Sequence, residues 1–263
     1  IDYSILDQHS ESYRKIRNTF RYLLGNLNDN FKDHDLENVN VEKLPELEQF
    51  MLHKIYHLNL NFEKNFKIYD FHNLYKELLN FCTVDLSAFY FDIRKDTLYC
   101  DPKDSSKRVS TLLLLNIILN SLLKWFAPIL SFTTEEIYQL VSKSKKSIHL
   151  ENFLDFPKKF DNPKLYKKWL EFIKIRDICN LSIEEKRATK DIGSSLEADL
   201  QIEVEKDIFN LCKNIDFAEI CITSVAKIKE GLNEKIKVTT KKAQGKKCPV
   251  CWKISKEKCL RHG

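Results

Sequence analysis

Thr111-Leu-Leu-Leu-Leu-Asn-Ile-Ile-Leu-Asn-Ser-Leu-Leu-Lys-Trp-Phe126 is the stretch that decides the fold. Its polar residues Asn116, Asn120 and Lys124 recur every four positions, so they form one polar stripe on an otherwise apolar helix. A membrane span would leave these polar groups in hydrocarbon, whereas a water-soluble bundle can accommodate them. The stretch therefore predicts a core helix of a soluble helical bundle and no membrane partner.

Helical periodicity extends to both sides of this core segment, which makes the first part of the chain mainly α. The expected helices cover residues 10 or 12 to 27, 45–65 and 70–89, the last with a bend. Thr133 and Glu136 have the spacing of a capping box that would begin a helix over 134–141. We expect residues 1–160 to form one helical bundle.

The pattern changes after Pro163. One more amphipathic helix is expected to end at about Lys186, and shorter segments then alternate with the period of two that is typical of strands. These expected strands are residues 200–204, 219–223 and 235–239. We therefore predict a small α/β junction over 161–240 and a separate C-terminal domain over 241–263.

Two short motifs in this last segment predict a metal site: Cys248-Pro-Val-Cys251 and Cys259-Leu-Arg-His262. A thiolate or imidazole at positions i and i+3 of a tight turn directs both donors at one ion, and two such turns complete a tetrahedral shell. We expect one structural zinc ion, held by Cys248, Cys251, Cys259 and His262.

The charge is distributed unevenly along the chain. The net charge is +5, but residues 225–263 contain 12 Lys and Arg against 3 Asp and Glu. A basic C-terminal segment on a mildly acidic body indicates a polyanionic partner such as RNA. The candidate RNA-binding residues beside the metal motif are Lys246, Lys247, Trp252, Lys253 and Arg261, with Arg14, Arg17 and Arg21 as a second stripe on the first helix.

Trp252 has two possible roles. It could stack on a base or ribose of an RNA loop, because unpaired bases bind aromatic side chains, or it could be the core aromatic residue of the small metal domain. The arginine stripe could likewise follow RNA phosphates or be a solvated helix face.

No self-contained catalytic site is evident. The five glycines are too dispersed for a phosphate-binding loop, and no nucleophile and base are recognisable. His53 and His57 have the i, i+4 spacing of a zinc-protease pair, but Lys54 replaces the general-base glutamate and no third ligand is evident. The other cysteines are scattered singly among apolar residues, which favours free thiols in a reducing cytoplasm.

The chain resembles the C-terminal third of bacterial isoleucyl-tRNA synthetases, which are class I aminoacyl-tRNA ligases, over nearly its entire length. The motifs that carry the resemblance are Ser12–Asn18, Leu23–Leu27, Tyr69–His72, Phe81–Tyr90, Asp92–Asp96, Trp125–Thr133 with Glu135 and Glu136, Ser147–Glu151, Ile192–Ala198 and Lys247–Trp252. The bundle motifs alone would admit the valyl enzymes, whereas Ile192–Ala198 with the terminal knuckle resembles the isoleucyl ones. One departure is His262, where this family usually has a fourth cysteine.

The resemblance implies a domain that binds the anticodon stem-loop of tRNA(Ile), followed by a zinc domain that helps to engage the tRNA. ATP and Mg²⁺ would act only through a catalytic domain, whose His-x-Gly-His and Lys-Met-Ser-Lys-Ser signatures are not in this sequence. Since the sequence also begins at Ile1 without a methionine, we expect a catalytically inactive, cytoplasmic and monomeric fragment of a ligase. The alternative is a free-standing zinc-dependent RNA-binding module.

Overall fold

The computed structural model describes residues 2–27, 35–142, 146–231, 236–259 and 261–262. These residues form two compact units. The first contains residues 1–98 and 102–163, and the second contains residues 99–101 and 164–263. The expected division into three domains remains a prediction.

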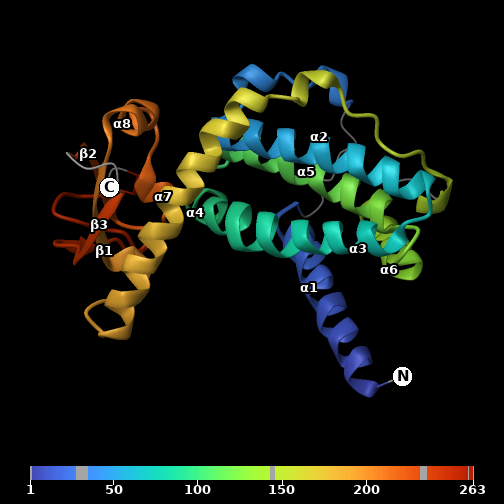
Figure 1. The fold of residues 1–263 in the computed structure, drawn as a ribbon, viewed down its shortest axis with the longest axis horizontal. Coiled ribbons are helices and arrows are strands. Elements are labelled where there is room, and N and C mark those ends of the chain that lie inside the picture. The colour runs from blue at the N-terminus through green and yellow to red at the C-terminus, as the bar shows by residue number, and fades with distance from the viewer. Residues whose placement is uncertain (1, 28–34, 143–145, 232–235, 260, 263) are drawn as a thin grey trace. The chain divides into compact units, whose positions relative to one another are not determined.

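The first unit is a bundle of long helices, which confirms the prediction of a mainly α fold (Figure 1). Its elements are α1 (Tyr3–Leu27), α2 (Glu46–Lys67), α3 (Phe71–Asn80), the π-helix η4 (Phe81–Phe91), α4 (Asp92–Cys100), α5 (Ser106–Phe126) and α6 (Ser131–Val141). Short 3-10 turns are η2 (Leu36–Asn38), η3 (Val41–Lys43), η5 (Ile148–Leu150) and η6 (Lys158–Phe160). Where the sequence predicted one bent helix over 70–89, α3 is followed by the π-helix η4, which continues directly into α4.

Helix α5 is the core of the bundle. It is long and apolar enough to cross a membrane by composition alone, but 83% of that window is buried inside the protein. Its polar residues find partners there: the Trp125 indole donates to Asn59 Oδ1 at 3.0 Å, and the Thr111 hydroxyl contacts Glu48. Glu48 also accepts two 2.6 Å hydrogen bonds from Arg94, so this fully buried carboxylate is paired.

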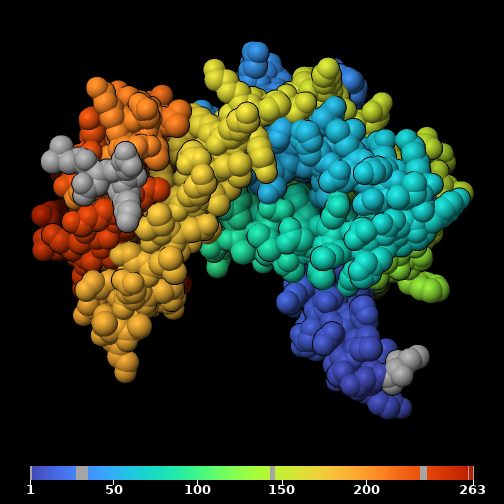
Figure 2. All heavy atoms as spheres, viewed as in Figure 1, coloured from blue at the N-terminus to red at the C-terminus, as the bar shows by residue number. Residues whose placement is uncertain are grey.

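The N-terminal half of α1 extends beyond the bundle (Figures 1 and 2). Burial within α1 begins at Ile16, which faces the core together with Phe20 and Leu23, whereas residues 3–11 are exposed. The first turns of α1 therefore lie outside the core of the bundle.

The predicted capping box at Thr133 is wrong. Helix α6 begins at Ser131, because the chain is already turning there: the Leu130 amide donates to the Phe126 carbonyl at 2.7 Å. Thr133 lies inside the helix, where its hydroxyl is 3.0 Å from the Tyr13 hydroxyl of α1.

The second unit combines one long helix with a three-stranded sheet (Figure 1). Its elements are α7 (Pro163–Ala188), η7 (Ser195–Glu197), β1 (Ala198–Val204), α8 (Lys206–Cys212), α9 (Phe217–Ile220), β2 (Val225–Glu230) and β3 (Lys237–Lys242), followed by the small hairpin of β4 (Lys246–Lys247) and β5 (Ile254–Ser255). The central strand β1 runs parallel to β2 and antiparallel to β3. The strict alternation of burial along β1 confirms its sequence prediction.

The strand expected over 219–223 is wrong. Asp216 caps a short helix here, since its carboxylate accepts from the amides of Ala218 and Glu219, and that helix is α9. The chain then turns through Ile222, whose φ is 56°, before β2 begins at Val225. The apolar alternation therefore reflects the buried side of α9 and the following turn.

Candidate metal centre and nucleic-acid interface

Two of the four predicted metal ligands, Cys248 and Cys251, lie in the tight turn of the β4–β5 hairpin, which we call the knuckle, and Cys259 and His262 lie in a second turn after β5. The Cys248 amide donates to the Lys253 carbonyl at 2.9 Å, and the Trp252 amide donates to the Cys248 carbonyl at 3.0 Å. Trp252 closes this turn with a left-handed φ of 64°. Gly245 allows the hairpin to close, because a Cβ there would lie 2.0 Å from the Ser255 carbonyl oxygen.

The structure brings all four predicted donors together, each within 4.8 Å of the others. The two sulfurs of Cys251 and Cys259 are 3.8 Å apart, and His262 Nδ1 lies 3.5 Å from Cys248 Sγ and 3.4 Å from Cys259 Sγ. Zinc bound tetrahedrally, about 2.3 Å from sulfur and about 2.0–2.1 Å from nitrogen, places two sulfurs about 3.8 Å apart and a sulfur and a nitrogen about 3.5 Å apart. The donor set and its spacing therefore fit a tetrahedral ion of this size.

Backbone amides prepare one of the thiols for metal binding. Hydrogen bonds from the amides of Cys251 and Val250 lower the pKa of Cys248 to about 6. Burial raises the pKa of the Cys251 thiol to about 11. A metal ion selects thiolates, so binding at this second cysteine would release a proton.

Cys100 and Asp101, which lie about 160 positions earlier in the sequence, contact His262 and Arg261 beside the other ligands. His262 Nε2 lies 3.0 Å from the Cys100 carbonyl oxygen, and Arg261 forms a 2.6 Å ion pair with Asp101. A carbonyl acceptor at Nε2 places the imidazole proton there and leaves the Nδ1 lone pair facing the cysteines. These contacts, all within the second unit, would provide the outer shell of a metal ion bound by His262.

The candidate RNA-binding residues beside the knuckle differ in their exposure to solvent. Lys246 and Lys247 are exposed, Lys253 is half-buried, and Trp252 is 58% exposed. The Lys247 ammonium lies 5.2 Å from the centre of the Trp252 ring. An indole this exposed is available for stacking and contributes little to a core.

Arg261 is engaged differently, since its guanidinium already pairs with Asp101. The role of Arg261 in holding the Cys259–His262 turn therefore competes with its expected role at an RNA phosphate. The sequence offers no signal for this ion pair, whose residues are 160 positions apart.

Arg14, Arg17 and Arg21 are exposed on one side of α1, opposite its buried residues. Arg14 forms a 3.0 Å ion pair with Glu11 one turn earlier. Within the described part of the chain, Arg17 and Arg21 make no ion pair. They remain available to a polyanion.

His53 and His57 of α2 form a cluster with Asp161, whose participation could not be predicted from the sequence. His57 Nε2 and His53 Nδ1 lie 2.9 and 3.2 Å from the same Asp161 oxygen. The Asn162 amide donates to His53 Nδ1 at 2.9 Å, so this lone pair is occupied. Burial lowers the pKa of His53 below its usual value, and the hydrogen bond from His57 lowers the pKa of Asp161. The cluster thus fastens residues 161–162 to α2 through hydrogen bonds.

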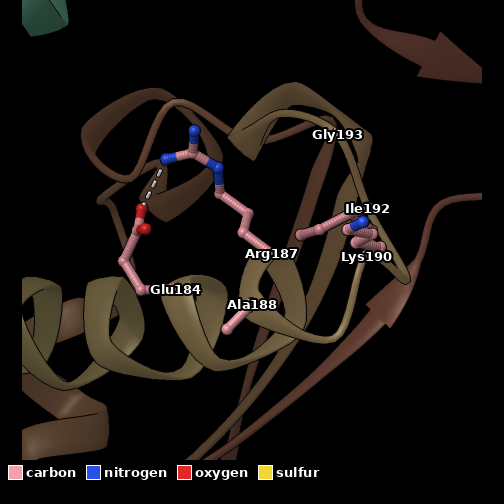
Figure 3. A pocket seen from close by; sticks show the side chains of 6 residues that line it. All are labelled: Glu184, Arg187, Ala188, Lys190, Ile192 and Gly193. Atoms are coloured by element: carbon pink, nitrogen blue, oxygen red, sulfur yellow. Dashed lines mark hydrogen bonds and ion pairs between the residues drawn. The ribbon is translucent and has the colours of Figure 1, made fainter.

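A surface pocket of about 450 Å³ lies at the C-terminal end of α7 (Figure 3). It is lined by Glu184, Arg187, Ala188, Lys190, Ile192 and Gly193. The Arg187 guanidinium turns toward Glu184 and pairs with it at 2.7 Å (Figure 3). Opposite charges are therefore balanced on this side of the pocket, which leaves Lys190 as the other cation in its lining.

Comparison with known proteins confirms the resemblance to a ligase family. The family described as the anticodon-binding domain of tRNA ligase matches residues 48–204. Isoleucine–tRNA ligase of Pelagibacter ubique is 65% identical over 262 residues, which is 100% of this chain and 29% of that protein. The ligases of Agrobacterium fabrum and Bartonella henselae are 38% and 36% identical over 96% of this chain, each covered to 27%.

The chain thus spans less than a third of the length of these relatives. The match of residues 48–204 runs from α2 to β1, so it covers the bundle without α1 and the beginning of the second unit. The chain belongs to the family of anticodon-binding domains of tRNA ligases.

Proposed function

We propose that this chain is the C-terminal, tRNA-recognition part of an isoleucine–tRNA ligase and binds the anticodon stem-loop of tRNA(Ile). The observation that carries the proposal is the anticodon-binding family match, together with 65% identity to one isoleucine–tRNA ligase along the chain. Attachment of isoleucine with ATP and Mg²⁺ would belong to the remainder of such a ligase. The proposal places the protein in the cytoplasm as a monomer.

The knuckle supports the RNA-binding part of this proposal. Trp252 would stack on a loop base or ribose, while Lys246, Lys247 and Lys253 would hold neighbouring phosphates. The exposed indole and the lysine above its ring support this role. Arg17 and Arg21 on α1 would bind further phosphates.

The metal of the proposal is one structural zinc ion, bound by Cys248, Cys251, Cys259 and His262. All four coordination positions would be protein ligands, so the ion would supply folding stability and leave no site for substrate. The tetrahedral spacing of the donors and the carbonyl acceptor at His262 Nε2 support this assignment.

The test is binding of a fluorescently labelled tRNA(Ile) transcript to the purified chain. We expect the affinity to fall steeply between 50 and 200 mM salt, because lysines and arginines replace condensed counterions. A transcript with a changed anticodon should bind more weakly, and the chain should show no isoleucine-dependent exchange of pyrophosphate into ATP. Equal binding of both transcripts, or adenylate formation, would contradict the proposal.

A further inference from the structure

Phe132 is 93% exposed at the beginning of α6, and no other large hydrophobic side chain in the described residues is so exposed. Isolated apolar residues on a surface are common, so the neighbouring residues decide whether Phe132 indicates a binding site. Its neighbour Thr133 contacts Tyr13 of α1 through their hydroxyl groups, 3.0 Å apart. This contact places the start of α6 beside the middle of α1, within the first unit.

The adjoining part of α1 carries exposed arginine side chains. Tyr13, which is 37% exposed, and Arg17 are one helical turn apart and lie beside each other on the helix surface. Arg14 and Arg21 continue this cationic side of α1. The projecting ring of Phe132 therefore adjoins a residue that contacts Tyr13, and Tyr13 lies one helical turn from the exposed Arg17.

An exposed aromatic ring beside cations is the arrangement that binds single-stranded nucleic acid. Every base offers a face for stacking, while arginines bind the flanking phosphates. We propose that Phe132 stacks on an unpaired base of a tRNA anticodon loop, with Arg17 and its neighbours on the backbone. This inference rests on the proposed function and adds a second stacking residue, on the bundle rather than on the knuckle.

The remaining groups on this side of α6 permit a discriminating test. Glu136 and Leu140 follow Phe132 at four-residue intervals, and Leu140 is 73% exposed. A protein partner on this helix face would contact Leu140 as well as Phe132. A stacked base would need only the aromatic ring, and Glu136 could accept a hydrogen bond from an exocyclic amino group of that base.

The experiment uses the full chain and an anticodon stem-loop RNA of tRNA(Ile) that carries 2-aminopurine at successive loop positions. We expect Phe132→Ala to weaken binding about 5- to 150-fold, the usual effect of losing one stacked base. Phe132→Trp should retain the affinity, and the matched variant Leu140→Ala should bind like the wild type. One loop position should show fluorescence quenching that Phe132→Ala abolishes.

The outcomes separate this inference from the proposed function. If the wild-type chain does not bind the RNA, the proposed function itself fails. If it binds and Phe132→Ala binds equally well, only the stacking role of Phe132 is overturned. Equal losses in Phe132→Ala and Leu140→Ala, or a change in oligomeric state, would instead assign this face to a protein contact. Circular dichroism of each variant checks that the helices remain folded.

Discussion

Trp252 combines a backbone constraint with an exposed side chain. Its φ of 64° closes the knuckle, and its ring is 58% exposed beside Lys247. We expect Trp252→Leu to retain zinc and to lose about 1–3 kcal/mol of tRNA-binding free energy, the usual contribution of a base–aromatic stack. Titration of labelled tRNA and elemental analysis of the same samples measure both quantities.

Trp252→Phe is the matched control, because it keeps an aromatic face at the same backbone position. It should recover most of the affinity. Loss of zinc or of order in the leucine variant would show that the indole instead belongs to the core of the knuckle.

We expect His53 to make the stability of the bundle depend on pH. Burial lowers the pKa of this imidazole, so the folded protein favours the neutral form. Its contribution is therefore complete above the unfolded-state pKa of about 6.5 and is lost as the pH falls through the lower folded-state value. Urea unfolding at pH 7.5 and at pH 5 should show a smaller decrease in unfolding free energy for His53→Gln than for the wild type.

His9→Gln provides the control, since His9 is exposed on α1. Its pH dependence should match that of the wild type. An unchanged pH dependence in His53→Gln would show that other groups are responsible.

Among the structural elements, the end of α4 has a role that its own sequence does not indicate. Asp101 binds Arg261 and the Cys100 carbonyl accepts from His262, so this segment holds the second turn of the candidate metal centre in place. Outer-shell partners of this kind typically contribute 10- to 100-fold to metal affinity. We expect Asp101→Asn to lower zinc affinity by about that factor in competition with a chromogenic chelator.

Asp104 lies exposed in the same loop and offers a matched control. Asp104→Asn should hold zinc as the wild type does. Arg261→Gln should reproduce the Asp101 effect, and combining both substitutions should add little, because each removes the same ion pair. Independent, additive losses would argue against this coupling.

The sequence predicted correctly those helices and strands whose patterns lie within one short stretch of residues. The polar stripe on α5 and the alternation of β1 are short-range patterns, and both predictions were confirmed. The paired Cys-x-x-(Cys/His) motifs are also short, and their four donor atoms lie together in the structure, while the metal site itself remains a prediction. The failures came from competing local chemistry: Asp216 caps a helix where apolar alternation indicated a strand, and the turn after α5 starts α6 before Thr133.

The long-range members of the sites could not be predicted in this way. Asp161 joins His53 across 108 residues, and Asp101 joins Arg261 across 160. Neither pairing has a periodicity or a spacing rule, because only the folded chain brings these residues together.

For the whole molecule, the two compact units should respond differently to loss of the metal. The bundle has its own apolar core around α5, whereas the segment after about Lys241 is too short to hold a fold by apolar burial alone. Cys248→Ala, or a strong chelator, should release about one zinc ion per chain. It should also increase amide hydrogen exchange after residue 241 and leave most of the far-UV helical signal unchanged.

Cys212→Ala is a suitable control, because this buried thiol lies on α8 and is not one of the four donors. It should keep its metal content. A metal content below half an ion per chain in the wild type, purified without chelators, would contradict the zinc assignment.

The contact between Cys100 and His262 spans 162 positions and therefore has a consequence during translation. At about 5–20 residues per second, a ribosome needs roughly 8–30 s to make the intervening polypeptide. The bundle helices can emerge and pack during that interval, while the carbonyl of Cys100 and the carboxylate of Asp101 still await their partners. Binding of the ion would then occur after the bundle has folded. A shortage of intracellular zinc would yield molecules with a folded bundle and an unfolded segment after about Lys241.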